Sequence, residues 1–423
     1  MERALFAQSK ALLTERTPES GRTMFDRDVI SFAHGAALRR YAIPAAIRSR
    51  AKAGQPVVRY ADQSGLLQEM ICERQRAWYH AAYPACALGL GVTSLVRAIA
   101  RARGVAGQSP LLVAAGYYHG CVRWASSVRM PFVPVRCDTL GHPDLDELKR
   151  LLELHPAATF LFANPGYLGT LLDRNKALAL AELITSKNCF LIEDTIFSRE
   201  IHCSGEQFYV SGFLPENYPS CIVDSAAKSY GLNPTRIGWL LGPRGTVDAV
   251  NKYLFESKWM PALEHQELLR NAIEDEAFLK QNREELGTRR ALVHECIERL
   301  NIKMARRVAE LPFPDGGSHS TLIRIHVEMP ACDPLHATRQ LLEQARVACS
   351  PGVSHGMRPN EVRINYSCAS DRLGKASTAG RPADSSDSME TSAKPDFAVG
   401  RDRLIDGLNR LATGIEWLAT QES

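Results

Sequence analysis

The amino-acid sequence predicts an α/β protein with a three-layer αβα large domain around a mostly parallel sheet, and a smaller α+β domain toward the C-terminus. Two observations carry this prediction. From about residue 85 to 245, short apolar runs alternate with longer amphipathic ones, which is typical of buried strands joined by crossover helices. After residue 245 the chain becomes a long, highly charged helical stretch. A length of 423 residues with 45% hydrophobic residues is sufficient for two substantial cores.

Six short, continuous apolar runs are the strands expected in the large sheet. They are PLLVA near residue 110, FVPV near 132, TFLFA near 159, CFLIE near 189, CIVD near 221 and IGWLLG near 237. The segments VTSLVRAIARARG, LDELKRLLELH and RNKALALAELITSKN have helical spacing and lie between them. Helical crossovers favour parallel strands that are covered on both faces.

The chain is expected to divide into three parts. Residues 1–50 form an N-terminal arm that belongs to the small domain, residues 51–260 form the large domain, and residues 261–423 form the small C-terminal domain. In the last part HSTLIRIHV and EVRINYSCA read as strands. Residues 372–396 are rich in Ser, Thr, Ala, Gly, Pro and Asp. With so little apolar surface to bury, this segment is expected to be a mobile or disordered surface insertion.

Composition excludes several classes of function. The formal net charge of +4 comes from 51 basic and 47 acidic residues that are spread along the chain, so no nucleic-acid partner is expected. The 11 cysteines are scattered and include no C-x-x-C pair, which argues against a disulfide framework or a zinc ribbon. We find no signal-peptide pattern and no long apolar run, so we expect a cytoplasmic protein with no metal and no membrane partner.

Three polar residues follow directly on predicted strands: Asn164 after TFLFA, Asp194 at the end of CFLIED, and Lys228 just beyond CIVD. Ligands bind at the carboxyl edge of a parallel sheet, so these side chains are expected to converge on one crevice. Each also has an ordinary explanation, because Asp194 could cap a helix, Asn164 could shape a turn, and Lys228 could lie in a solvated loop.

The spacing within DSAAKSYGLNPTRIGW favours the functional interpretation. Lys228 lies three residues after Ser225, Arg236 lies eight residues after the lysine, and Gly238 follows. This pattern resembles the lysine motif of the fold-type I pyridoxal-phosphate (PLP) enzymes, the aspartate aminotransferase superfamily, aminotransferase class I/II. The resemblance implies PLP as cofactor, a Schiff base on Lys228, and a phosphate group held by Ser225 and Arg236.

Other segments resemble the same family in the same order along the chain. The resemblance implies that the amides of Val92 and Thr93 in ALGLGVTS bind the phosphate, as helix N-termini do. An aromatic ring of VAAGYYHG stacks on the pyridine; Tyr117 aligns best and Tyr118 is the alternative. Asn164 bonds the phenolic oxygen and Asp194 the pyridine nitrogen. Tyr60, in RYADQSG, reaches the phosphate of a partner subunit, which implies a homodimer.

Substrate contacts follow from the same resemblance. Arg363 in EVRINYSCASD would bind the carboxylate of a small-molecule amino acid, and Gly35 and Tyr167 complete the expected substrate site. Lys228, Asp194 and Tyr117 are the expected catalytic residues.

Two positions depart from the family pattern. Phe197 stands three residues after Asp194, where these enzymes commonly have a tyrosine whose hydroxyl donates to the phenolic oxygen. The loop NPGYLGT lacks the second Asn-Pro-Thr-Gly part of the family loop, and Tyr167 within it is either a loop anchor or a substrate contact. Both changes make ordinary transamination less certain as the reaction.

The resemblance predicts an aminotransferase. The first alternative is a specialised PLP enzyme that carries out elimination, replacement, cyclisation or oxidation of an amino acid in secondary metabolism. A remote alternative is a non-catalytic effector-binding domain. A nucleotide-binding protein is disfavoured because LGLGVTS has only two glycines of the G-x-G-x-x-G pattern.

Overall fold

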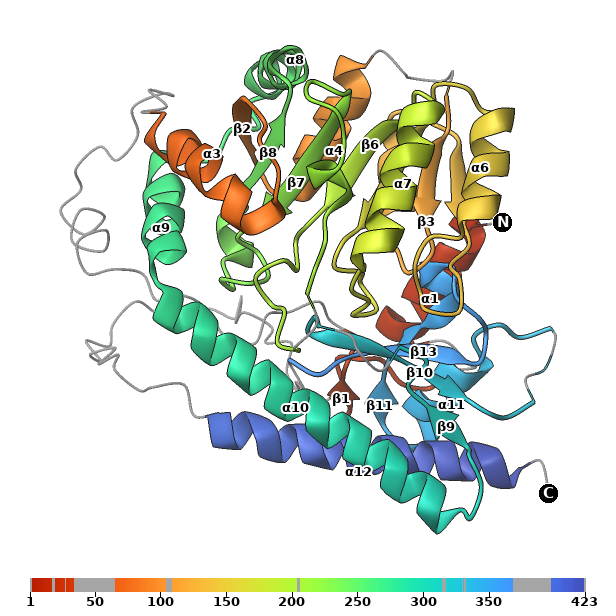
Figure 1. Cartoon of the computed structure of the whole chain (residues 1–423). Coiled ribbons are helices and arrows are strands. Elements are labelled where there is room, and N and C mark those ends of the chain that lie inside the picture. Colours follow the sequence, from red (N-terminus) through yellow and green to blue (C-terminus); the bar gives the residue numbers. More distant parts are fainter. Residues whose placement is uncertain are drawn as a thin grey trace, which may run out of the picture.

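The structure is a computed structural model (Figure 1). It describes residues 2–16, 20–26, 28–33, 65–103, 109–203, 206–313, 317–328, 330, 332–367 and 397–421. Predictions for Gly35, Tyr60 and the insertion 372–396 therefore lie outside the described residues.

The large domain contains a seven-stranded sheet in the order β2-β8-β7-β6-β5-β3-β4. β8 pairs antiparallel with β2 and β7, and the other neighbours pair parallel. All six predicted strands are present. The sequence analysis missed β2, which comes first along the chain among the strands of this sheet. The strands are β2 (Ala85–Gly89), β3 (Leu111–Ala114), β4 (Phe132–Val135), β5 (Thr159–Ala163), β6 (Phe190–Asp194), β7 (Ser220–Ser225) and β8 (Gly238–Gly242).

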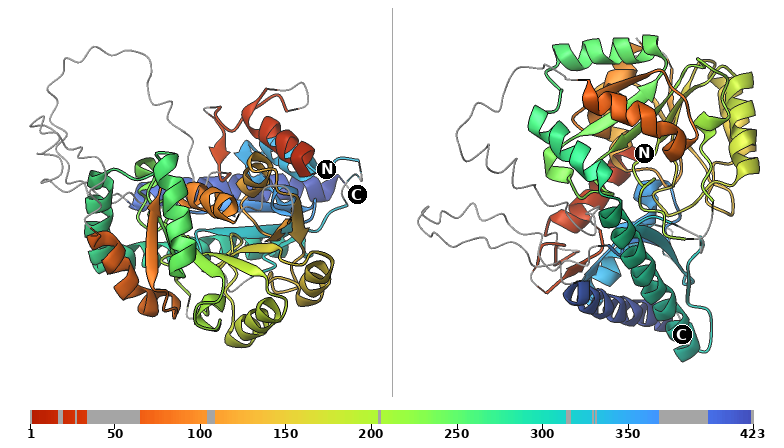
Figure 2. Two further views of the ribbon diagram at one scale, coloured as in Figure 1. Left: turned by 90° about the horizontal axis from the view of Figure 1, so that it is seen from above. Right: turned by 60° about the vertical axis from the view of Figure 1, so that its left-hand side comes forward.

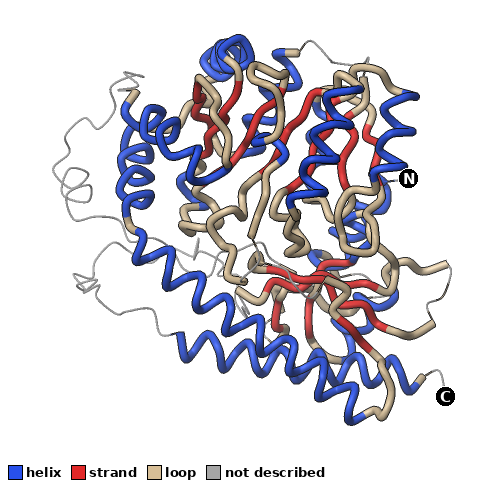
Figure 3. Tube along the Cα trace, in the orientation of Figure 1, coloured by secondary structure: helices blue, strands red, loops and turns tan. Residues whose placement is uncertain are grey.

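Helices cover both faces of this sheet (Figure 3). One face packs against α4 (Val92–Ala102), α5 (Gly120–Ser127) and α8 (Arg244–Glu256). The other face packs against α6 (Leu145–Leu154) and α7 (Arg174–Ser186) at one end of the sheet, and against α3 (Leu66–Tyr79) and α9 (Leu263–Glu274) at the other. This is the predicted three-layer αβα arrangement.

Local sequence signals explain where some of these helices begin. The carboxylate of Asp144 accepts a hydrogen bond from the Glu147 amide (3.0 Å) at the start of α6, and Asp173 does the same for the Lys176 amide (2.8 Å) at the start of α7. Such caps satisfy amides that have no partner within the helix.

The smaller domain is built on an antiparallel sheet in the order β12-β13-β10-β9 and a two-stranded parallel pair, β1-β11. The long helices α10 and α12 lie side by side along it, as Figures 1 and 2 both show. The predicted α/β fold class with a second, α+β domain is confirmed. The elements are β1 (Ile30–Ser31), α10 (Glu276–Lys303), β9 (Ala309–Glu310), β10 (Ser320–Ile325), α11 (His336–Gln344), β11 (Val347–Ala348), β12 (Ser350–Pro351), β13 (Glu361–Asn365) and α12 (Phe397–Thr420).

The N-terminal helix α1 (Glu2–Thr14) joins the two domains, because it contacts α5 of the large domain and the short helix η3 (Gly352–His355) of the small one. None of the described helices is both long and apolar enough to cross a membrane.

Candidate active site

A cavity of about 550 Å³ lies at the carboxyl edge of the large sheet, where α1 and the small domain close over it. Lys228 and Arg236 line it, together with Tyr118 and His119 from the segment after β3. This is the edge at which open α/β sheets bind ligands. The structure therefore brings the predicted motif residues to the predicted crevice.

Lys228 is half-buried and follows the end of β7. Burial lowers the pKa of its amine to about 8, and the charge of Arg363 lowers it further, whereas Glu200 acts in the opposite direction. Removing a lysine from water disfavours its charged form. A substantial fraction of this amine is therefore neutral near physiological pH, as a nucleophile or a base must be.

Asp194 ends β6 and its side chain is buried in the same region. Burial raises the pKa of this carboxyl group to about 7, and neighbouring Asp224 adds to the rise. The Ile196 amide, which donates a hydrogen bond at 3.2 Å, and the side chains of Lys228 and Tyr167 act against that rise. A carboxyl group in this state can hold or share a proton with a basic ring nitrogen.

The predicted phosphate site is assembled at the N-terminus of α4. Gly91 caps the helix with φ 77°, and a Cβ atom there would lie 3.3 Å from the guanidinium of Arg236. The first amide that bonds to this cap is that of Ser94, so the amides of Val92 and Thr93 precede the hydrogen-bonded ladder. Helix amides, the helix dipole and an exposed arginine together form an anion site.

Ser225 is the last residue of β7 and is buried. Its hydroxyl oxygen accepts a hydrogen bond from the Ala227 amide at 2.9 Å. That bond shapes the turn leading to Lys228, and it leaves the hydroxyl hydrogen available to an anion. Gly238 lies beside this turn, and a Cβ there would come within 2.9 Å of the Gly91 Cα. The glycine therefore allows β8 and the start of α4 to approach each other.

Arg363 lies on β13, opposite Leu322 of β10, and is buried. Its Nε lies 3.4 Å from the Ser320 hydroxyl, and no acid within the described part of the chain is among the groups that act on its charge. Burial lowers its pKa to about 10, while the Tyr167 and Tyr118 hydroxyls act against that shift. A buried guanidinium without an acidic partner fits a carboxylate ligand.

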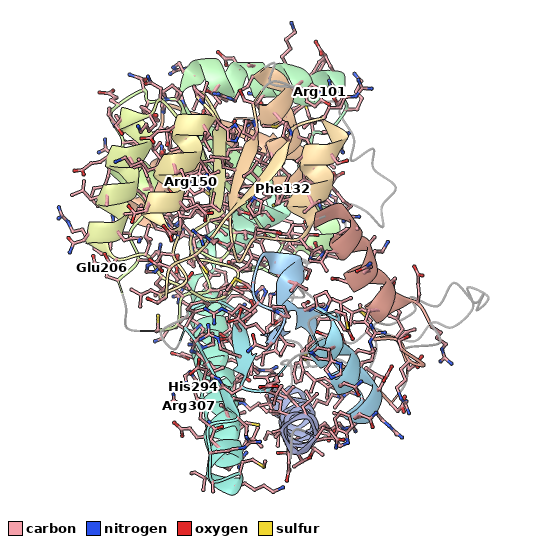
Figure 4. All side chains as sticks on the ribbon, turned by 90° about the vertical axis from the view of Figure 1, so that its right-hand side faces the viewer. Arg101, Phe132, Arg150, Glu206, His294 and Arg307 are labelled. Atoms are coloured by element: carbon pink, nitrogen blue, oxygen red, sulfur yellow. The ribbon has the colours of Figure 1, made fainter. Side chains whose placement is uncertain are left out.

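The structure places the two adjacent tyrosines differently, and it favours Tyr118, the alternative, for the ring beside the cavity. Tyr118 lines the cavity and stacks on Tyr167, with ring centroids 5.8 Å apart and an interplanar angle of 20°. Tyr117 is buried in the core, edge-on to Phe132 of β4 at 5.2 Å (Phe132 is labelled in Figure 4). The physical reason is that the two neighbouring side chains leave the segment after β3 in different directions, so that one faces the cavity and the other the core.

Asn164 is also placed differently from its expected role. The side-chain nitrogen Nδ2 of Asn164 donates hydrogen bonds to the Glu193 carboxylate (2.6 Å) and to the Phe208 carbonyl oxygen (2.9 Å). Its side-chain oxygen Oδ1 accepts one from the Gln207 side chain. Glu193 precedes Asp194 on β6, so its side chain lies on the opposite face of the sheet. The structure therefore does not bring the side-chain amide of Asn164 together with the side chains of Asp194 and Lys228, and its expected bond to a phenolic oxygen stays a prediction.

Tyr167 and Phe197 occupy the space beside Asp194. Tyr167 is buried, and its hydroxyl lowers the pKa of the Asp194 carboxyl group. Its backbone oxygen accepts a hydrogen bond from the Ser320 hydroxyl at 2.6 Å, which joins the two domains. Tyr167 therefore serves as a loop anchor, and its hydroxyl also reaches the site.

Sequence analysis missed Glu200, His119 and His319, which the fold brings close to Lys228. The charges of Lys228 and Arg363 both act on the two histidines. A signal was present for Glu200, because it lies six residues after Asp194 in the segment that follows β6. No comparable signal marks His319, which the small domain supplies.

These residues fit PLP. The α4 N-terminus with Ser225 and Arg236 could hold its phosphate, Lys228 its aldehyde carbon, Asp194 its ring nitrogen, and Tyr118 one face of its ring. Arg363 would remain for the carboxylate of a substrate. No group of three or more metal-ligating side chains occurs among the residues that the structure describes.

Comparison with known proteins gives the same family. The family model described as "Aminotransferase class I and II" matches residues 28–377. Among curated relatives, an aspartate/prephenate aminotransferase of Thermus thermophilus is 26% identical over 238 residues, covering 55% of this chain and 58% of the relative. A 1-aminocyclopropane-1-carboxylate synthase of Glycine max is 24% identical over 286 residues, covering 62% and 57%. The matches thus span less than two thirds of these relatives' own lengths.

Solved structures agree on the fold. An aspartate aminotransferase from Rhodobacter sphaeroides superposes with a TM-score of 0.75 at 16% identity, covering 98% of this chain and 99% of that one. A Thermus thermophilus aspartate aminotransferase mutant gives a TM-score of 0.73 at 19% identity, covering 98% and 96%. At this identity the likeness establishes the architecture alone.

Proposed function

Because the chain belongs to the aminotransferase class I and II family, we propose that it is a PLP-dependent enzyme that acts on an α-amino acid through Lys228, most simply as an aminotransferase. The family match confirms the resemblance found in the sequence. The observation that carries the proposal is a single cavity lined by Lys228 and Arg236. The charge of Lys228 acts on the buried Asp194 carboxyl group, and Arg236 lies beside the N-terminus of α4.

When bound, PLP supplies an aldehyde that captures amines and an electron-poor ring that accepts the electrons released at Cα. The protein's own residues supply the rest. The Lys228 amine, with its pKa of about 8, is suited to remove a proton from the substrate Cα and to return it elsewhere. The Asp194 carboxyl group would hold a proton at the ring nitrogen, and Arg363 would bind the substrate carboxylate by a forked pair of hydrogen bonds.

A second candidate is a specialised reaction at the substrate side chain, such as elimination or cyclisation. The observation that favours it is Phe197, whose phenyl ring has no hydroxyl to donate where these enzymes commonly carry a tyrosine. The absence of this donor changes the basicity of the neighbouring groups, which distinguishes this site from one that carries the tyrosine.

The test is the visible absorbance of purified protein with added PLP, before and after a panel of amino acids. The proposal expects a yellow wild-type protein whose spectrum changes with a substrate, and a Lys228→Ala variant that lacks this band. Products formed with and without a keto acid, and with and without oxygen, separate transamination from the second candidate. A wild-type protein that ignores PLP would refute both.

Two further expectations belong to this proposal. The resemblance implies a homodimer with shared active sites, and a cytoplasmic location suits a chain with 11 scattered cysteines. Light scattering of the purified protein tests the first, and cell fractionation tests the second.

A further inference from the structure

One face of α1 forms a wall of the cavity. Five of its residues line the cavity and are spaced three and four positions apart, so they lie on a single face of the helix. From the first to the last is eight positions, a rise of about 12 Å along the helix axis. None of the roles above uses this wall. Its residues are Phe6, Ser9, Lys10, Leu13 and Thr14.

The charges that line the cavity are unbalanced. Lys10, Arg123, Lys228 and Arg236 line it, and its described lining contains no Asp or Glu. PLP would engage Lys228 through its aldehyde and Arg236 through its phosphate. Lys10 of α1 and Arg123 of α5 are exposed and have no role in that arrangement. Two cations beyond those that the cofactor needs indicate a second anion.

Ser9 supplies a hydrogen-bond donor beside these cations. Three other aliphatic hydroxyl groups on the cavity wall, those of Thr14, Ser350 and Ser354, each donate to a backbone carbonyl, at 2.9, 3.2 and 2.7 Å. Ser9 is only 4% exposed, and its hydroxyl oxygen has no hydrogen-bond partner among the described residues. Buried polar atoms are nearly always hydrogen-bonded, so the exception on this wall indicates a ligand.

Ser9, Lys10 and Arg123 gather around the ring of Phe6, and we call these three residues the α1 donor cluster. The guanidinium carbon of Arg123 lies 5.4 Å from the centre of that ring. Ser9 and Lys10 follow Phe6 by three and four positions, which makes them its neighbours on the helix surface. The cluster therefore combines a hydroxyl, an ammonium and a guanidinium group, which are donors that bind carboxylates and phosphates.

Phe6 also indicates how far this cluster lies from the cofactor site. Its ring stacks on His119, with centroids 5.3 Å apart and an interplanar angle of 26°. His119 in turn contacts Tyr118, with ring centroids 4.6 Å apart. Tyr118 is the residue expected against the cofactor ring, so the cluster lies two ring contacts beyond it. This separation favours a substrate side chain longer than the single methylene group of aspartate.

We propose that the α1 donor cluster is the side-chain subsite of the enzyme, and that the substrate is an α-amino acid with an extended side chain that ends in an anionic group, a carboxylate or a phosphate. This inference rests on the proposed function. In this arrangement Arg363 binds the α-carboxylate, the substrate reacts beside Lys228, and its side chain runs along α1 to the cluster. Helix α1 thereby determines which amino acid is accepted.

The first experiment measures kcat/KM of the PLP-loaded wild type for a series of unbranched amino acids. Each has one to four methylene groups and ends in a carboxylate, a phosphonate or an uncharged amide. At equal length we expect the anion to exceed the amide by about tenfold or more, which is the effect of one charge-assisted hydrogen bond. The preference should increase from one methylene group to three. The carboxylate and phosphonate arms identify which anion the cluster prefers.

Variants then test whether the cluster is responsible. The double variant Lys10→Gln/Arg123→Gln removes both cations and should lose most of the preference for the anion over the amide. Ser9→Ala removes the hydroxyl group and should lose a smaller part of it. The matched control is Arg101→Gln/Lys149→Gln, which removes the same charge from exposed positions of α4 and α6 outside the cavity lining. This control should keep the wild-type preference.

A binding measurement gives a readout that does not depend on turnover. Linear dicarboxylic acids lack the amine and cannot react, and calorimetry measures their Kd for the PLP-loaded protein. We expect this Kd to rise about tenfold or more in the double variant and to keep its wild-type value in the control. The monoamides of the same acids should bind the wild type more weakly than the acids do.

An amide that reacts as well as the anion at every length would overturn the inference, as would a preference that survives in the double variant. A best substrate with an apolar or aromatic side chain would also overturn it. A wild type that neither binds PLP nor converts any amino acid overturns the proposed function itself, whereas an active wild type without the preference for an anion overturns this inference alone.

Discussion

The rings of Tyr167 and Phe197 meet edge to face, with centroids 4.7 Å apart and an interplanar angle of 88°. This contact places a phenol beside a phenyl group at the end of β6, where Asp194 lies. The hydroxyl group beside Phe197 therefore belongs to Tyr167, a residue from a different loop. Tyr167 uses it to act on the Asp194 carboxyl group.

Removing that hydroxyl should make Asp194 a weaker acid. In Tyr167→Phe the charged carboxylate loses an interaction that favours it, so its pKa should rise above about 7. Carbon NMR of aspartate-labelled protein without PLP, assigned with Asp194→Asn, measures this value. Tyr218→Phe is the control, because its hydroxyl bonds the Ile184 and Cys189 carbonyls instead. An unchanged titration in Tyr167→Phe would refute the interaction.

Asn164 should matter more for stability than for the cofactor. Its amide is one of four groups that bond the buried carboxylate of Glu193, beside the Val210 amide and the amide and hydroxyl of Ser211. Asn164→Ala leaves that carboxylate short of a partner, which costs about 1–3 kcal/mol of unfolding free energy.

Denaturant unfolding measures the loss in Asn164→Ala, and the double variant with Glu193→Gln measures the coupling between the two residues. The absorbance maximum of bound PLP should stay where it is in the wild type. Normal stability together with a shifted absorbance would instead support the family role of Asn164 at the phenolic oxygen.

The large domain was predictable because its strands are continuous apolar runs, and these depend on local sequence alone. β2 was missed because Ala85–Gly89 lies at the edge of the sheet and carries mostly small residues. The lysine motif was also predictable, since Ser225, Lys228 and Arg236 all lie between the end of β7 and the start of β8, so their spacing is a local feature of the sequence.

Other parts of the site depend on contacts between distant segments. The choice of Tyr118 over Tyr117 depends on the direction of the chain as it leaves β3. His319 is 119 positions from Glu200 in the sequence, so only the packing of the two domains brings them together. No local pattern could have predicted either.

Gly120 is expected to determine where the Tyr118 ring lies. A Cβ atom at this position would overlap three atoms of that ring, so Gly120→Ala must displace the ring from the cavity wall. We expect weaker PLP binding, measured by equilibrium dialysis. Gly245→Ala is the matched control, since nothing lies within 4 Å of its added Cβ atom. Equal affinities in both variants would mean that Tyr118 does not support the cofactor ring.

The depressed pKa of Lys228 predicts how PLP incorporation depends on pH. Only the neutral amine attacks an aldehyde, and its fraction rises about tenfold per pH unit below the pKa. The rate of incorporation into the PLP-free protein should therefore rise with pH and level off above about pH 8, whereas an ordinary lysine would keep accelerating to about pH 10. The growth of the absorbance band in stopped-flow mixing measures this rate. The reference is Nα-acetyl-lysine, which keeps a free ε-amine, in the same buffers.

Variants of Arg363 identify one cause of that depression. The positive charge of Arg363 lowers the pKa of Lys228 after burial has done so. Arg363→Gln removes the charge, so the inflection should move to higher pH. Arg363→Lys keeps the charge and should leave the inflection near the wild-type value, while it weakens substrate binding because a lysine cannot make the forked contact to a carboxylate. An inflection that stays in place in Arg363→Gln would leave burial as the cause and remove Arg363 from the electrostatics of the lysine.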